Sequence, residues 1–114
     1  MPTICIIGLG YIGLPTAVIF ASRGYKVIGV DLNKSVLEKV NKGESHIKEP
    51  DLDTFLRKVI KNKLLIAQET PSCSNIYIIA VPTPHTLGEK GFYYPDTSMV
   101  FQAIEQICPY IEKE

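Results

Sequence analysis

Three glycines near the N-terminus constrain the fold of this chain more than any other feature. Gly8, Gly10 and Gly13 form a GxGxxG pattern at the end of residues 3–8, TICIIG, an apolar run rich in β-branched side chains. Such a run predicts a strand that is covered on both faces. The stretch that follows, about residues 12–23, predicts a helix. A glycine-rich turn between a strand and a helix is typical of dinucleotide-binding folds.

Strand and helix patterns alternate along the rest of the chain. Further strands are expected at residues 25–31, 64–67 and 76–81. Helices are expected after three residues that can cap them: Asn33, Asp51 and Asp96. Their apolar faces predict these inward side chains: Val36, Leu37 and Val40; then Leu52, Phe55, Leu56, Val59 and Ile60; and finally Val100, Ala103, Ile104 and Ile107. In the first helix the predicted inward residues are Ala17, Val18 and Ala21.

This alternation predicts an α/β fold with a parallel sheet, doubly wound and Rossmann-like. The expected strand order is 3-2-1-4, so the first and fourth strands flank the crevice where ligands bind in such sheets. The sheet is expected to stop after the fourth strand and its helix. Between those two elements, residues 85–95 are interpreted as a long irregular loop.

Size and charge narrow the possible functions. The chain has 114 residues, which suits one domain, and its 12 basic and 12 acidic residues give a formal net charge of zero. No basic excess therefore indicates nucleic acid or an anionic membrane as a partner. No apolar run approaches the ~20 residues that span a bilayer. Because the N-terminal MPTIC lacks the basic start of a signal peptide, we expect a cytoplasmic protein.

The three cysteines give no sign of a metal site or a disulfide framework. Cys5, Cys73 and Cys108 form no CxxC pair, and their number is odd. Cys5 lies among isoleucines and is interpreted as a small buried apolar residue. No cysteine is expected to be a nucleophile, because each has a packing role and no histidine close by in the sequence.

Each glycine of the pattern has a distinct expected role. Gly8 allows a tight turn, Gly10 lets the backbone approach a pyrophosphate, and Gly13 lets the helix pack against the strand. The backbone amides near Tyr11 and Ile12 then face the phosphates at the positive end of the helix. The alternative is a tight turn that binds nothing.

Asp31 completes the pattern, 18 positions after Gly13 and at the end of the second strand. A carboxylate there accepts hydrogen bonds from the hydroxyls of the adenosine ribose. The same charge repels a 2′-phosphate, so we expect NAD rather than NADP as the ligand. The alternative is an ordinary surface aspartate.

A second group of candidate residues follows the fourth strand. Pro82 and Thr83 lie where the strand ends, opposite the glycine turn, and the Thr83 hydroxyl could contact the cofactor. The alternative is that Pro82 and Pro84 merely end the strand, and the residues alone leave both interpretations open. His46 and His85 are interpreted as solvated loop residues.

Several longer strings resemble one family. CIIGLGYIGLPTAVIFASRGYKVIGVD, GESHIKEPDL, AVPTP and PDTSMV are similar to the N-terminal part of the UDP-sugar dehydrogenases, and the resemblance covers nearly the whole chain. Asp51 and Pro82 resemble the branch acting on UDP-N-acetylmannosamine or UDP-N-acetylglucosamine more than the UDP-glucose branch. The resemblance implies NAD contacts at four residues: Tyr11, Ile12, Asp31 and Thr83.

The resemblance also implies a reaction, the oxidation of the sugar C6 hydroxyl to a carboxylate in two steps with two NAD and a cysteine nucleophile. That cysteine, a central domain and a UDP-binding domain lie beyond residue 114 in the family. Residues 1–114 are therefore expected to form an incomplete NAD-binding domain that has no catalytic residues and meets the UDP-sugar only through the absent domains. We expect it to self-associate through the edge of the fourth strand or the outer face of the last helix.

Two alternatives to a UDP-N-acetylhexosamine 6-dehydrogenase fragment remain. One is a stand-alone NAD-binding module without catalysis, and the other is a fragment of a UDP-glucose 6-dehydrogenase. A dehydrogenase of hydroxy acids is disfavoured by HIKEPDL and VPTP together.

Overall fold

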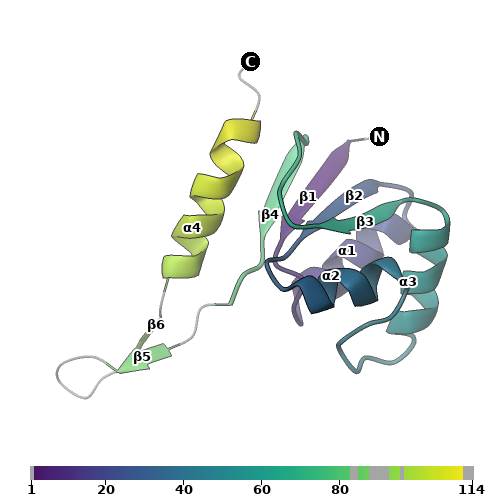
Figure 1. The fold of residues 1–114 in the computed structure, drawn as a ribbon, viewed down its shortest axis with the longest axis horizontal. Coiled ribbons are helices and arrows are strands. Elements are labelled where there is room, and N and C mark those ends of the chain that lie inside the picture. Colours follow the sequence, from purple (N-terminus) through teal and green to yellow (C-terminus); the bar gives the residue numbers. More distant parts are fainter. Residues whose placement is uncertain (1, 83–84, 88–92, 96, 112–114) are drawn as a thin grey trace.

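A four-stranded parallel sheet forms the centre of the molecule. The computed structural model describes residues 2–82, 85–87, 93–95 and 97–111, with side chains described outside 85–87 and 93–95. Its sheet has the order β3-β2-β1-β4 (Figure 1), which confirms the predicted order. The strands are β1 (Thr3–Ile7), β2 (Lys26–Val30), β3 (Leu65–Gln68) and β4 (Ile76–Ile79).

Helices cover the two faces of this sheet unequally. Three helices pack against one face: α1 (Gly13–Ser22), α2 (Lys34–Asn41) and α3 (Leu52–Lys61). The other face is covered by α4 (Ser98–Ile107), which continues as the short 3-10 helix η1 (Cys108–Tyr110). Among the described residues, no helix is long and apolar enough to cross a membrane.

Alternation along each strand divides the apolar side chains between two cores. In β1, Ile4 and Ile6 face the core beneath α1, α2 and α3, while Cys5 and Ile7 face the core beneath α4. Because both faces are covered, the continuous apolar run at residues 3–8 forms a strand as predicted.

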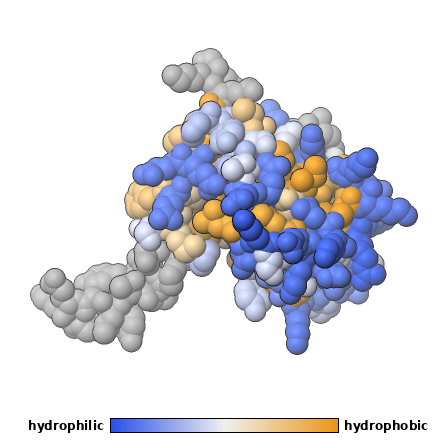
Figure 2. All heavy atoms as spheres, viewed as in Figure 1, coloured by the Kyte–Doolittle hydropathy of each residue, from blue (hydrophilic) through white to orange (hydrophobic). Residues whose placement is uncertain are grey.

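The second core is the less complete of the two. Ile66 of β3, which pairs with Ile28 and so lies on this face, is 45% exposed. In the space-filling view, hydrophobic residues gather on the part of the surface between α4 and the three-helix layer (Figure 2). One helix is too narrow to cover the whole face of a four-stranded sheet.

One of the three predicted helix caps is confirmed. The Asn33 side chain accepts hydrogen bonds from the backbone amides of Ser35 (3.0 Å) and Val36 (3.4 Å) at the start of α2. The cap predicted at Asp51 is wrong, because its backbone is left-handed (φ 62°) and its side chain makes no capping bond. Capping needs an extended backbone that aims the side chain at the first amides. Asp96 lies outside the described residues, and Thr97 precedes α4 without a side-chain cap.

The predicted inward faces are correct for α1 and α2 and need correction in α3 and α4. Ala17, Val18 and Ala21 are buried, as is Val40, with Val36 and Leu37 packed against the same core. Phe55 and Ile104 were predicted to point inward but are 51% and 40% exposed. In each helix the true contact face is a narrow stripe, through Leu52, Leu56 and Val59 in α3 and through Ala103 and Ile107 in α4.

Residues 85–95 contain a short antiparallel pair of strands, so the prediction of an irregular loop is wrong. β5 (His85–Leu87) pairs with β6 (Tyr93–Pro95) in a two-stranded sheet. The pair lies away from the four-stranded sheet, beyond the start of α4 (Figure 1). Two consecutive tyrosines favour extended backbone, but three-residue strands are too short to show alternation in the sequence.

Candidate dinucleotide-binding site

The turn after β1 depends on glycine at its first position. Gly8 has a φ of +102°, which side-chain-bearing residues rarely adopt. A Cβ at Gly8 would lie 2.7 Å from the carbonyl oxygen of Ala80, just after β4. The Gly8 amide donates to the Val30 carbonyl oxygen at 2.8 Å. The tight turn predicted at Gly8 is confirmed, and the missing side chain also lets the ends of β1 and β4 meet.

The other two glycines of the pattern differ in their surroundings. Gly13 is the first residue of α1, and a Cβ there would overlap the carbonyl oxygen of Gly8. This confirms that Gly13 allows the helix to pack closely against the strand. By contrast, among the described residues and apart from its chain neighbours, no heavy atom would lie within 4 Å of a Cβ on Gly10. The described part of the chain therefore leaves open the space that a side chain at Gly10 would fill.

The start of α1 faces outward. Tyr11 and Ile12 are 76% and 72% exposed, and the helix begins with bonds from the Leu14 amide to the Gly10 carbonyl and from the Thr16 amide to the Ile12 carbonyl. The first amides of an α-helix have no acceptor within the helix, and they lie at the positive end of its dipole. An anion can bind at such a position.

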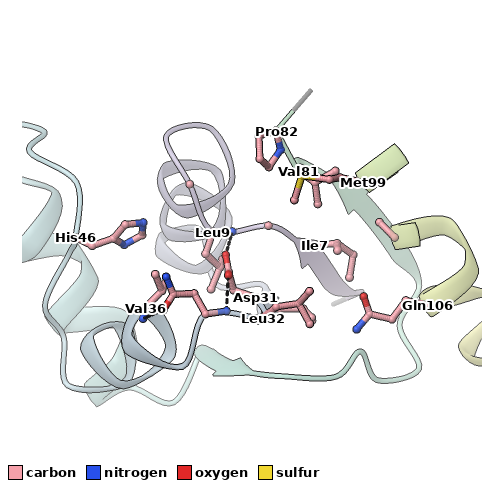
Figure 3. Close-up of a pocket in the computed structure, with 15 residues that line it drawn as sticks. Ile7, Leu9, Asp31, Leu32, Val36, His46, Val81, Pro82, Met99 and Gln106 are labelled. Carbon is pink, nitrogen blue, oxygen red and sulfur yellow. Dashed lines mark hydrogen bonds between the residues drawn. The ribbon is translucent and has the colours of Figure 1, made fainter. Parts of the chain in front are cut away.

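Asp31 lies directly across from this turn, at the end of β2. Its Oδ2 accepts a hydrogen bond from the Leu9 amide at 3.0 Å, and its Oδ1 accepts one from the Asn33 amide at 2.9 Å (Figure 3). Each carboxylate oxygen has two lone pairs, so both can accept a further hydrogen bond. The carboxylate thus has capacity for a pair of hydroxyl donors.

The glycine turn, Asp31 and the end of β4 surround one cavity of about 340 Å³ (Figure 3). Its volume is within the range of small-molecule sites. Predicted site residues in its wall are Gly8, Gly10, Asp31 and Pro82. Tyr11, Ile12 and Gly13 are not in the wall but form the adjoining start of α1. Thr83 lies outside the described residues.

Several wall residues were not predicted from the sequence. α4 contributes Met99, Ala103 and Gln106, and the region after β2 contributes Leu32 and Val36. His46 is exposed, as expected of a loop residue, yet it borders the same cavity (Figure 3). The sequence predicts the helix α4 from its 3.6-residue period. It does not predict that this helix borders the cavity, because that position depends on the path of the chain between β4 and α4.

The cysteines lie apart from this cavity wall. Cys5 is fully buried in the core beneath α4, and burial raises the pKa of its thiol. A protonated, enclosed thiol is a poor nucleophile, so the interpretation of Cys5 as a packing residue is confirmed. Cys73 and Cys108 are exposed.

These features together define a class of protein. A glycine turn, an acidic residue at the end of the adjacent strand and a cavity at the switch point of a parallel sheet make up a dinucleotide-binding domain of the doubly wound, Rossmann kind. The chain belongs to the UDP-glucose/GDP-mannose dehydrogenase family, whose NAD-binding domain matches residues 2–114.

Three of the similar proteins carry the same activity in their names. The UDP-N-acetyl-D-mannosamine dehydrogenases of Campylobacter jejuni and Escherichia coli are 54% and 46% identical to this chain over 111 residues, or 96% and 97% of it. The solved UDP-N-acetyl-mannosamine dehydrogenase of Staphylococcus aureus superimposes with a TM-score of 0.91 at 38% identity over 97% of this chain. In each case the chain spans about a quarter (26%) of the relative's length.

Proposed function

We propose that this cavity and the adjoining start of α1 hold NAD, with the diphosphate on the amides near Tyr11 and Ile12. The observation that carries the proposal is the open space at Gly10, where a Cβ would meet no atom of the described residues within 4 Å apart from its chain neighbours. Cβ atoms at Gly8 and Gly13 would instead collide with backbone. Steric demands inside the protein account for two of the three glycines. A ligand that approaches the backbone accounts for the third.

Asp31 is the proposed ribose-binding residue. Its carboxylate lies beside the glycine turn and has lone pairs left for the two vicinal hydroxyls of the adenosine ribose. The same negative charge disfavours a 2′-phosphate, so the proposed preference is for NAD over NADP.

Residues 82 and 83 are proposed to contact the cofactor from the other side of the crevice. Pro82 borders the cavity next to Val81, at the end of the strand adjacent to β1. A proline there fixes the backbone direction as the chain leaves the sheet, and Thr83 brings a hydroxyl that can donate or accept a hydrogen bond.

For the whole protein we propose the activity that its relatives' names give, dehydrogenation of UDP-N-acetyl-D-mannosamine. The family resemblance adds that the C6 hydroxyl is oxidised to a carboxylate. Bound NAD supplies a hydride acceptor for this oxidation. Identities of 46–54% to dehydrogenases of that name support this substrate over UDP-glucose, as do Asp51 and Pro82. In this proposal residues 1–114 are an incomplete NAD-binding domain, and the central domain, the UDP-binding domain and the catalytic residues belong to the remaining part. A cytoplasmic enzyme that supplies a sugar acid for polysaccharide synthesis fits the same proposal.

Titration calorimetry of the purified chain with NAD and NADP tests the binding site. We expect NAD to bind, NADP to bind more weakly and UDP-N-acetylmannosamine not to be oxidised by this chain alone. Absence of NAD binding by a folded chain would refute the proposed site. For the protein of full length, faster oxidation of UDP-glucose than of UDP-N-acetylmannosamine would refute the proposed substrate.

Self-association of this chain is also proposed. On the described part of the chain, β4 has β1 as a neighbour on one side and no strand on the other. The outer face of α4 carries Phe101, 63% exposed, and Ile104, 40% exposed. An unpaired strand edge next to apolar surface favours association with a second copy.

A further inference from the structure

Leu9 lies between the first two glycines of the turn and makes two contacts with the end of β2. Its backbone amide bonds to Asp31, which follows the strand, and its side chain packs against Gly29 within it. The Leu9 amide donates to Asp31 Oδ2 at 3.0 Å. The Leu9 side chain is fully buried and lies against Gly29, where an added Cβ would come within 2.8 Å and 3.1 Å of its two methyl carbons. Gly29 lies in β2 and Asp31 directly follows its last residue, so both contacts to Leu9 come from the end of one strand.

The space at Gly29 is therefore matched to the Leu9 side chain. Leu9 is packed in the core beneath α1 with no exposed surface into which its methyl groups could move. An added methyl group at residue 29 would displace Leu9, because close-packed cores have few voids to absorb it. Since Leu9 is joined directly to Gly8 and Gly10, its displacement moves the turn.

We infer that Gly29 and Asp31 are positioning residues that hold Leu9 and so set the shape of the diphosphate-binding turn. The inference rests on the proposed function, since it concerns the same cofactor. It assigns to Gly29 a role outside the GxGxxG pattern, and it gives the Asp31 carboxylate a second task besides the ribose. The end of β2 then fixes the ribose-binding and the diphosphate-binding parts of the site relative to each other.

The variant Gly29→Ala tests this inference when its affinities for ADP and adenosine are compared by calorimetry or NMR titration. ADP uses both the ribose and the diphosphate parts of the site, whereas adenosine uses the ribose part alone. We expect ADP affinity to fall on the order of tenfold while adenosine affinity changes less than about twofold. A general loss of structure would weaken both ligands alike.

A compensating change sharpens the test. Leu9→Val removes about the volume that Gly29→Ala adds, so the double variant Leu9→Val/Gly29→Ala is expected to recover most of the ADP affinity. This variant also keeps the inference testable if Gly29→Ala alone does not fold. Val27→Ala is the matched control, because Val27 is buried on the same face of β2, two positions before Gly29. It should lower stability without changing the ratio of ADP to adenosine affinity.

Three results would overturn the inference. One is a folded Gly29→Ala that binds ADP as tightly as the unaltered chain. Another is an equal loss of ADP and adenosine affinity in Gly29→Ala. The third is a double variant Leu9→Val/Gly29→Ala that folds but does not recover ADP affinity. If the unaltered chain binds neither NAD nor ADP, the proposed function fails first and this inference fails with it.

Discussion

The side chain of Asn41 binds both backbone groups of Ala67. Its Nδ2 donates to the Ala67 carbonyl oxygen at 2.8 Å, and its Oδ1 accepts from the Ala67 amide at 2.9 Å. Asn41 ends α2, and Ala67 lies in β3, an outer strand of the sheet. The amide side chain thus takes the place of a neighbouring strand at this edge. Among the described residues β4, at the opposite edge, has no side chain in such a role.

We expect Asn41→Asp to lower the free energy of unfolding by about 1–2 kcal/mol, since it replaces the donor to Ala67 with a second acceptor. Urea unfolding followed by circular dichroism measures this change. Asn62→Asp is the control, because Asn62 is an exposed residue after a helix with no side-chain hydrogen bond described, and it should change stability by less than about 0.5 kcal/mol. Equal effects at both positions would show that the bond to Ala67 contributes nothing.

Alanine at Gly10 and alanine at Gly8 should separate binding from folding. Gly10→Ala is expected to keep the stability of the chain and to weaken NAD binding at least about tenfold, because the methyl group enters open space where the diphosphate is proposed to lie. Gly8→Ala is expected to lower stability by about 2 kcal/mol or more, since it combines a positive φ with a collision at Ala80. Calorimetry and urea unfolding on both variants provide the two measurements. Unchanged NAD affinity in Gly10→Ala would place the diphosphate elsewhere.

Removal of the Asp31 carboxylate should change coenzyme preference. We expect Asp31→Ala to weaken NAD binding roughly 10- to 100-fold, the range for losing hydrogen bonds to a charged group. The affinity for NADP should fall less than the affinity for NAD, because the substitution also removes the repulsion between the carboxylate and the 2′-phosphate. The ratio of the two dissociation constants is the informative quantity. A ratio equal to that of the unaltered chain would argue against a ribose contact at Asp31.

Self-association can be tested by analytical ultracentrifugation over a range of concentrations. We expect assemblies larger than a monomer. A charge on the outer face of α4 (Phe101→Glu) or at the edge of β4 (Ile76→Lys) should lower the fraction of the chain in these assemblies. A matched charge on exposed Phe55 (Phe55→Lys) of α3, which packs on the other face of the sheet from α4, is the control. A compact monomer at every concentration would contradict the proposal.

The three thiols should differ in reactivity. An aromatic disulfide reagent is expected to modify Cys73 and Cys108 in the native chain, whereas Cys5 should react only after unfolding, because it is fully buried. Burial raises the pKa of Cys5 above its ordinary value of 9.0, so the folded state holds this proton more tightly than the unfolded state. Its contribution to stability is present below pH 9.0 and is lost as the pH rises through the folded-state pKa. Fast labelling of Cys5 in the native chain would contradict this.

The sheet and the position of the site could be predicted because their signals are local. The run before Gly8, the glycine spacing and the acid at the end of the next strand are each set by neighbours in the chain. Parallel connections of one hand then allow few strand orders. The site therefore follows from a short stretch of sequence.

The errors share a different cause. Phe55 and Ile104 fit the helical period but stay 51% and 40% exposed, because α3 and α4 each bury a narrow stripe. Asp51 is a good capping residue whose left-handed backbone prevents capping. Gly29 gives no sign in the sequence of its contact with Leu9, since that contact depends on how the turn folds back over β2. Each of these depends on tertiary packing that residue spacing does not encode.

The Asp31 carboxylate accepts two hydrogen bonds, one from the Leu9 amide and one from the Asn33 amide. These bonds limit how this domain could be redesigned for a different coenzyme. A small neutral replacement that admits a phosphorylated ribose would also leave the Leu9 amide without its acceptor. A successful redesign would need a side chain that carries no charge yet still accepts a hydrogen bond from that amide, such as asparagine, together with a cation nearby. Natural divergence between the two coenzymes would face the same constraint, and the two substitutions would be expected to arise together.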